Sequence, residues 1–294
     1  MSPLGAGAPS TDRPHRVRSP LVERFLEERA AIVATGFLAL LVAVALLAPV
    51  LAPSGYAQGD LSIVSSPPSS THWLGTDELG RDVFSRFLYG ARTSLFAAVQ
   101  AVGVALLIGL PAGLIAGYVG GWVDTVLSRL NDAVMSAPAL VLAVAVVAVL
   151  GPGLSNAMLA IGIVFAPSLF RIVRGATLQV RAETYIEACR AIGCTPLRIM
   201  VRHVLLNIVA PVVAQVTILL GLSMLAEASL SFLGLGVRPP EPSWGSLLRE
   251  AFDNLYVAPY LVYAPGITIG LTVLAFSQVG DGVRAALSAS RKRV

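Results

Sequence analysis

Long uncharged stretches are the feature that most limits how this chain can fold. Each is long enough to contain the ~20 apolar residues that cross the hydrocarbon core of a bilayer as a helix. Only 13% of the 294 residues are charged, about half the share that is usual in soluble domains. The sequence therefore predicts an all-α integral membrane protein. The uncharged stretches cover residues 30–59, 93–123, 133–170, 204–226 and 254–280.

The third stretch is too long for a single helix. Gly-Pro-Gly at residues 151–153 divides it, because proline and flanking glycines end helices and favour a tight turn. Six membrane-spanning helices are therefore expected. The first apolar run exceeds the roughly 7–15 residues of a signal peptide, so we expect it to be retained. The expected spans are residues 30–51, 93–118, 133–150, 157–174, 204–225 and 259–280.

The basic residues predict the orientation in the membrane. Short cytoplasmic segments of membrane proteins carry most of the lysine and arginine. With the N-terminus inside, the cytoplasmic segments hold 16 of the 21 basic residues, six of them within residues 171–202. Both termini are therefore expected in the cytoplasm. The net charge of +4 is mostly a signal of topology, and the dispersed arginines do not indicate a nucleic-acid partner.

These boundaries divide the chain into four parts. A cytoplasmic tail (1–29) precedes the first span and an extracytoplasmic segment (30–92). A core with five spans follows (93–281), and a cytoplasmic tail (282–294) ends the chain. Within the extracytoplasmic segment, apolar spacing predicts a short amphipathic helix over residues 77–89, with Thr76 or Asp77 as its N-cap.

Three glycines in the second span predict a tightly packed bundle. Gly109, Gly113 and Gly117 recur at four-residue spacing, which places them on one face of a helix. Such a face allows the backbone of a second helix to approach closely.

A half-polar segment interrupts the apolar runs at residues 181–203. Helical spacing in its first half ends at Gly193, which can break a helix. Thr195 then provides an N-cap and Pro196 the first helical residue of a second helix. Two cytoplasmic helices joined by a tight turn are therefore expected between the fourth and fifth spans.

Two interpretations of this segment remain open from the residues alone. Its arginines could bind lipid headgroups, which would make it an interfacial linker. Alternatively, the first helix docks into a groove of a soluble partner. Ala188 and Cys189 are small enough to enter such a groove, and Glu187 would supply a directional contact.

Four motifs resemble those of a known family. EACRAIG at residues 187–193, followed by nine residues and HVLLN, resembles the EAA loop of ABC importer permeases. Residues 72–95, 225–248 and 271–288 are similar to the C-type permease subunit of dipeptide, oligopeptide and nickel uptake systems. The resemblance covers roughly residues 22–290. It implies the type I (MetI-like) permease fold, with six transmembrane helices and a cytoplasmic coupling helix, in the bacterial inner membrane.

The resemblance also implies partners and coupling residues. A homologous permease would complete a heterodimer, two ABC ATPase subunits would dock on the EAA loops, and an extracytoplasmic solute-binding protein would deliver a peptide. Cys189 and Leu206 depart from the family pattern, which has alanine and proline there, so we expect a straighter helix running into the fifth span. The coupling residues implied are Glu187, Ala188, Cys189, Gly193, Thr195, Pro196 and Asn207.

The chain is not expected to hydrolyse ATP or to bind a cofactor or metal. A P-loop needs a lysine that reaches the phosphates, and the only lysine here is Lys292, which Arg293 follows. ATP and Mg²⁺ would therefore be used by the partner subunits. Cys189 and Cys194 lie on the reducing side, where a structural disulfide is not expected.

Polar residues near the outer ends of the spans provide further candidates. Glu227, with Ser231 beside it, could line the substrate pathway, although a structural hydrogen bond to another span is equally consistent with the sequence. An extracytoplasmic surface facing the binding protein is expected from Asp77, Glu78, Arg81, Asp82 and Trp244.

Two rival functions are less well supported. A proton-coupled transporter would need several ionisable groups within its spans, and Glu227 is nearly alone. An intramembrane protease would need a zinc or serine motif that the sequence lacks. The expected function is ATP-driven peptide import by alternating access, with nickel or another small solute as the alternative cargo.

Overall fold

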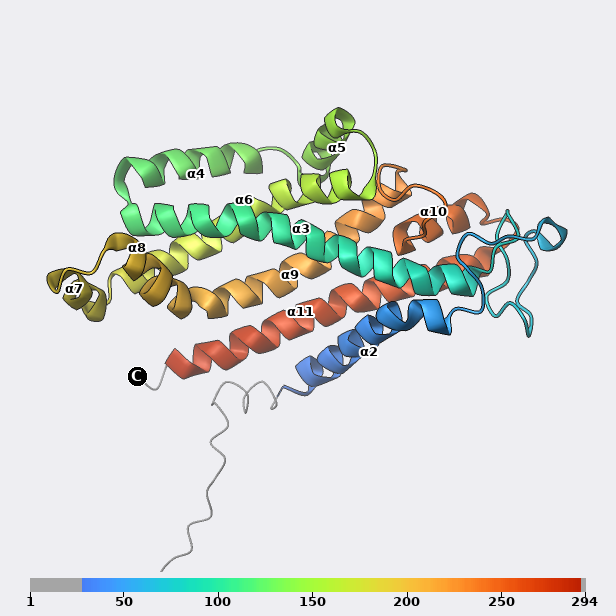
Figure 1. Cartoon of the computed structure of the whole chain (residues 1–294), viewed down its shortest axis with the longest axis horizontal. Coiled ribbons are helices and arrows are strands. Elements are labelled where there is room, and N and C mark those ends of the chain that lie inside the picture. Colours follow the sequence, from blue (N-terminus) through green and yellow to red (C-terminus); the bar gives the residue numbers. More distant parts are fainter. Residues whose placement is uncertain (1–27, 292–294) are drawn as a thin grey trace, which may run out of the picture.

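Five helices are long and apolar enough to cross a membrane in the computed structural model, which describes residues 28–291. They lie side by side in an elongated bundle (Figure 1). A sixth span exists if a sharply bent helix pair, α4 and α5, is counted as one. The expected all-α membrane fold is therefore confirmed, with five spanning helices or six if the bent pair is one span. The five helices are α2 (Arg29–Leu51), α3 (Val83–Val119), α6 (Leu154–Arg181), α9 (Leu205–Phe232) and α11 (Tyr263–Arg291).

The predicted third span is wrong as a single straight helix. Helix α4 (Gly121–Met135) and helix α5 (Ala139–Leu150) are separate and meet at 91°. Pro138 explains the break, because a proline disfavours the helical conformation of the residue before it. At about 1.5 Å per residue, neither helix alone reaches across a bilayer. The Gly-Pro-Gly turn that follows lies between α5 and α6, as predicted.

The second span begins ten residues earlier than expected. The predicted amphipathic helix at 77–89 does not form as a separate element, and neither Thr76 nor Asp77 is an N-cap. Asp82 takes that position instead, and its carboxylate accepts a hydrogen bond of 2.7 Å from the backbone N–H of Ser85. From Val83 the helix continues without a break to Val119. The first span agrees with prediction to within one residue.

The glycine face of α3 packs against α6, as predicted. A Cβ atom added to Gly109 would lie 2.6 Å from the carbonyl oxygen of Ala166, and one added to Gly113 would lie 2.7 Å from that of Phe170. Gly117 is equally close to Thr177, at 2.7 Å. Because no real Cβ fits at such distances, α3 and α6 are in close contact over about two turns. We refer to this packed pair as the α3–α6 unit.

The bundle has two different ends (Figure 1). At one, which we call the α7 end, α7 (Thr184–Ala191) and α8 (Pro196–Arg198) connect α6 to α9, and a π-helical segment, Ile199–Val204, joins α8 to α9. At the other, the α10 end, residues 52–82 form an irregular loop beside α10 (Trp244–Asp253). Two short 3-10 helices, Leu61–Ile63 and Pro259–Val262, also lie at the α10 end.

The predicted tails are mostly outside the part of the chain that can be described. The N-terminal tail, residues 1–29, falls almost entirely outside the described residues. Of the C-terminal tail, residues 292–294 do so, whereas the preceding residues continue α11.

Candidate functional site

The turn between α7 and α8 has the conformation that the sequence predicted. Gly193 has a φ of +83°, which lies in the left-handed region that favours glycine. The Thr195 hydroxyl accepts a hydrogen bond from the backbone N–H of Arg198 at 3.4 Å, and Pro196 is the first residue of α8. The helical hairpin expected between α6 and α9 is therefore confirmed.

Helix α7 is attached to the bundle by one face only. Ile186 is completely buried in the largest apolar cluster, and Cys189 and Cys194 are half-buried free thiols that pack against the same cluster. Glu187 and Ala188, on the outer side, are exposed.

Exposed apolar side chains flank the turn after α7. Ile192 is 79% exposed and Leu197 is 67% exposed, one on each side of Gly193. These two side chains are therefore available to contact a protein or a membrane.

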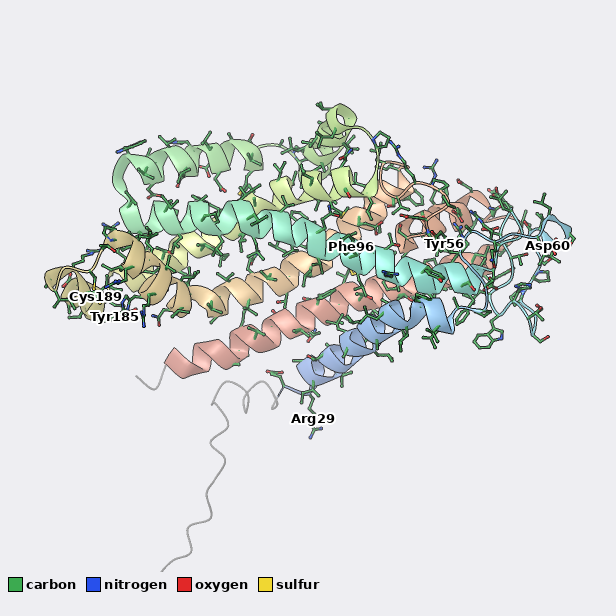
Figure 2. All side chains as sticks on the ribbon, viewed as in Figure 1. Arg29, Tyr56, Asp60, Phe96, Tyr185 and Cys189 are labelled. Atoms are coloured by element: carbon green, nitrogen blue, oxygen red, sulfur yellow. The ribbon has the colours of Figure 1, made fainter. Side chains whose placement is uncertain are left out.

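Asn207 lies near α7, although it belongs to α9. Its side-chain amide donates hydrogen bonds to the Tyr185 hydroxyl at 3.1 Å and to the carbonyl of His203 at 2.7 Å. Figure 2 shows Tyr185 and Cys189 at the α7 end, with Tyr56 and Asp60 at the opposite end. The structure therefore gathers all seven predicted coupling residues at one end of the bundle.

The π-helical segment lies just before Leu206, the position where the family pattern has proline. A π-helix is a local widening of the helical turn, and here it covers Ile199–Val204. The missing proline predicts a straighter helix running into the fifth span, whereas the structure has a π-helical segment there. The sequence held no signal for this segment, which nevertheless makes the entry to α9 irregular.

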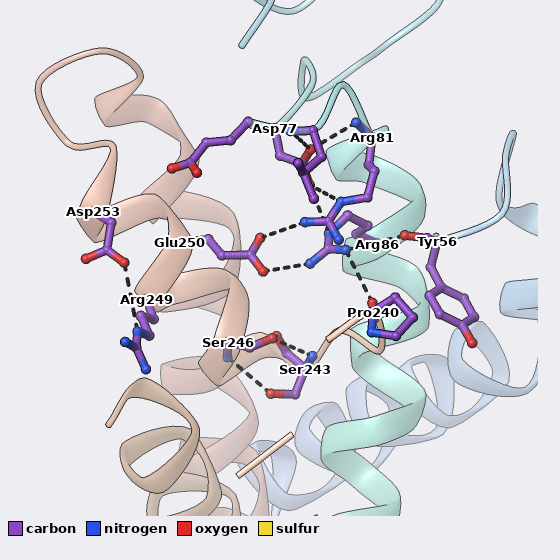
Figure 3. Close-up of polar contacts among 12 residues, drawn as sticks. Tyr56, Asp77, Arg81, Arg86, Pro240, Ser243, Ser246, Arg249, Glu250 and Asp253 are labelled. Atoms are coloured by element: carbon purple, nitrogen blue, oxygen red, sulfur yellow. Dashed lines mark hydrogen bonds and ion pairs between the residues drawn. The ribbon is translucent and has the colours of Figure 1, made fainter. Parts of the chain in front are cut away.

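The α10 end contains a largely buried cluster of charged side chains (Figure 3). Arg86 of α3 is 1% exposed, and its guanidinium lies 2.7 Å from the Glu250 carboxylate of α10. Asp77 binds Arg81 at 2.7 Å and lies 3.4 Å from Arg86. Glu250 lies between the two arginines, since Arg81 approaches its second oxygen at 3.9 Å. The cluster ties the loop, α3 and α10 together.

Burial controls the ionisation of Glu250. Loss of solvent raises the pKa of this carboxyl above its ordinary value, and the charges of Arg86 and Arg81 counter part of that rise.

Most of the residues predicted to face a binding protein are internal in this structure. Asp77, Arg81 and Asp82 are each less than one-tenth exposed, and Trp244 is completely buried. The Trp244 ring stacks on Phe87, with 5.8 Å between ring centroids. The fifth residue, Glu78, is exposed and hydrogen-bonds Asn254. The first four are thus structural residues here, and only Glu78 remains available to a partner.

A cavity of about 240 Å³ lies beside the charged cluster. Its walls are mostly apolar, and Glu78, Arg81 and Asn254 provide polar groups. The cavity lies between the loop and α10, so a partner at the α10 end would meet it.

Glu227 is the centre of a second buried network. It is 1% exposed, and its carboxylate accepts hydrogen bonds from Ser94 of α3 at 3.1 Å and from Ser231 at 2.6 Å. The Ser94 hydroxyl also accepts from the backbone N–H of Trp244 at 3.1 Å. These contacts favour the structural interpretation of Glu227 and Ser231 in this conformation, and lining of a pathway by them stays a prediction.

Sequence reasoning missed Arg86, Glu250 and Ser94. One signal was present: Arg86 stands among the apolar positions Val83 and Phe87 of a helix, where a charge needs a buried partner. The identity of the partner could not be read, because Glu250 is 164 positions away. Among the described residues, no group of three His, Cys, Asp or Glu side chains is placed to hold a metal ion.

Comparison with known proteins identifies the family. Residues 109–293 match the family described as the binding-protein-dependent transport system inner membrane component, and residues 21–68 match the N-terminal transmembrane domain of oligopeptide transport permease C. The chain belongs to this family of permeases. It is thus the membrane component of an ABC importer rather than an enzyme, and a multi-pass inner membrane protein.

Curated relatives match over nearly the whole chain. The glutathione transport system permease protein GsiD of Pectobacterium atrosepticum is 43% identical over 95% of this chain and 94% of its own length. GsiD from a strain of Escherichia coli is also 43% identical, over 94% of this chain and 92% of its own.

Solved structures support the fold of this permease. Two inward-facing structures of the MetNI methionine ABC transporter contain a chain that is 21% identical. The TM-scores are 0.57 and 0.54, over 69% and 67% of this chain and 97% and 96% of that chain. At this identity the likeness concerns the fold alone.

Proposed function

We propose that this permease is the peptide-conducting subunit of an ATP-driven importer, and that α7 is its contact with the ATPase. The observation that carries the proposal is the open face of α7. Glu187 and Ala188 are exposed on it, and Ile192 and Leu197 are exposed beside it. Small residues, a carboxylate and apolar anchors together suit a helix that enters a groove of a soluble protein.

The ATPase site belongs to other subunits. This chain lacks the lysine of a P-loop, so two ABC ATPase subunits would bind ATP and Mg²⁺. One would dock on this permease and the other on a homologous permease, which completes a heterodimer. Basic residues around α7 support a cytoplasmic position for this end, and hence for both termini.

The α10 end would then face the solute-binding protein. Exposed Glu78 and the adjacent cavity are the features available to it. Closure of the ATPase dimer would displace α7 and shift the permease from an inward-facing to an outward-facing state. This requires ATP to bind the two states with different affinity.

The proposed cargo is a short peptide. The relatives from Pectobacterium atrosepticum and Escherichia coli are named as glutathione transport permeases, and glutathione is a tripeptide. The similarity to an oligopeptide permease domain over residues 21–68 supports the same class. Nickel or another small solute is the alternative within the family.

Uptake by the complete complex in proteoliposomes tests this proposal. Radiolabelled reduced glutathione should accumulate only with ATP and with all subunits present, and an uncoupler should not abolish accumulation. Uptake of nickel without uptake of peptides would reject the proposed cargo. Accumulation that needs a proton gradient and no ATPase would reject the proposed mechanism.

A further inference from the structure

A side-chain hydrogen bond joins α7 directly to α9, in addition to the covalent connection between the two helices. The Asn207 side-chain amide donates a hydrogen bond of 3.1 Å to the Tyr185 hydroxyl, across 22 positions of sequence. The covalent route between these residues passes through the glycine turn and the π-helical segment Ile199–Val204. Neither is a stiff connection, because a glycine turn and a π-helical segment are common places for a helix to bend.

A second contact joins α7 to α3. The Arg190 guanidinium lies 5.5 Å from the centroid of the Tyr118 ring. A guanidinium over an aromatic face is attracted by the negative charge of that face. Tyr118 is 8% exposed and stands at the end of α3, directly after Gly117, which contacts α6. A displacement of Arg190 therefore acts on the α3–α6 unit.

We propose that Tyr185 and Arg190 are positioning residues that transmit the displacement of α7 to two helices at once, Tyr185 to α9 and Arg190 to the α3–α6 unit. This inference rests on the proposed contact between α7 and an ATPase. Tyr185 and Arg190 lie near opposite ends of the eight-residue helix α7. Their contacts therefore hold the helix against rotation as well as translation.

The buried residue between them explains why the contacts are needed. Ile186 fixes α7 to the apolar cluster, but a single apolar anchor is non-directional. Hydrogen bonds and stacked guanidinium groups have defined geometry. The outer face, with Glu187 and Ala188, remains free for the partner.

The test uses the complete complex with labelled reduced glutathione as the probe. Three quantities are measured: co-purification of the ATPase subunits, ATP hydrolysis, and glutathione transported per ATP hydrolysed. Tyr185→Phe and Arg190→Gln should each lower transport per ATP by about threefold or more, the scale of mutations that weaken coupling. Co-purification should stay unchanged within about twofold.

Matched variants separate positioning from general damage. Tyr256→Phe removes a tyrosine hydroxyl from a fully exposed residue at the α10 end, and Arg202→Gln removes an exposed arginine at the α7 end. Both should leave coupling unchanged. Tyr118→Phe keeps the aromatic face and should preserve coupling, whereas Tyr118→Leu should lower it. Asn207→Ala should lower coupling at least as much as Tyr185→Phe, because it removes the hydrogen bond to Tyr185 and also the one to the carbonyl of His203.

Two results would overturn the inference. Unchanged transport per ATP in both Tyr185→Phe and Arg190→Gln would show that the contacts transmit nothing. A loss of co-purification in proportion to the loss of transport would make the two residues docking contacts. Failure of the proposed function is distinct from both, because the unaltered complex would then show no ATP-dependent uptake.

Discussion

The two ends of this permease differ in how their polar residues are used. At the α10 end, a largely buried set of charged side chains is paired within the chain, as Arg86 binds Glu250 and Arg81 binds Asp77. At the α7 end, Glu187 is exposed and apolar Ile192 faces outward. The charged cluster of the α10 end thus has its binding partners within this chain. The exposed groups of the α7 end are available to a partner protein. Substitutions at the two ends should accordingly affect stability and coupling separately.

The largest effect is expected from the buried pair at the α10 end. Arg86→Met leaves Glu250 without its main partner and removes the second arginine beside Asp77. It should lower the free energy of unfolding by roughly 3 kcal/mol, the scale for breaking a buried ion pair. Unfolding in detergent micelles measures this loss. Arg249→Met is the control, since Arg249 and Asp253 form an exposed pair at 3.8 Å that should contribute less than about 1 kcal/mol. Equal losses in both variants would contradict the distinction between the largely buried cluster and the exposed pair.

The second effect concerns the turn at the α7 end. Gly193→Val forces a β-branched residue into a positive φ, which should misplace α7 and lower glutathione transport by about tenfold or more. Membrane insertion should be unchanged. Gly103→Val is the control, because an added Cβ there meets open space in ordinary helix. Normal transport by Gly193→Val would contradict a role for the turn.

A smaller effect is expected at Glu227. Glu227→Gln keeps a carbonyl acceptor for one serine hydroxyl and offers an amide N–H donor to the other, so it should cost about 1 kcal/mol or less in unfolding free energy. The KM for glutathione uptake should stay within about twofold, as for a residue that does not touch the substrate. A large rise in KM with unchanged stability would instead place Glu227 in the substrate pathway.

The smallest effect is the pH dependence of Glu250. Because burial raises the pKa of this carboxyl in the folded protein, the folded chain binds the proton more readily than the unfolded chain. The unfolding free energy should therefore rise as the pH falls through the folded pKa, and level off below the unfolded value of about 4.3. Glu250→Gln should lack this rise. If acidification instead weakens the wild-type protein relative to Glu250→Gln, the ion pair with Arg86 outweighs burial.

Structural features that depend on residues close together in the sequence could be predicted. The ends of α2 follow from a run of apolar residues with charges before it. The α7 hairpin follows from Gly193, Thr195 and Pro196, whose backbone preferences act within a few residues. The glycine spacing of α3 correctly indicated close packing against another helix.

The sequence did not show which of several suitable residues takes a given structural role. Both Asp77 and Asp82 are suitable N-caps, and the choice depends on Asp77 binding Arg81 and Arg86. Pro138 was a local signal for a break, but the uniformly apolar residues around it concealed the change of direction. The partner of Arg86 depends on packing between distant helices, which no local pattern encodes.

Cross-linking at α7 tests the central claim most directly. The chain has only two cysteines, Cys189 and Cys194, so replacing both with serine allows a single reactive cysteine at Ala188. In the complete complex, the account predicts that Ala188→Cys cross-links to an ATPase subunit, and that Tyr256→Cys at the α10 end does not. Reaction of Ala188→Cys only with solvent or lipid reagents, with no second polypeptide attached, would contradict it.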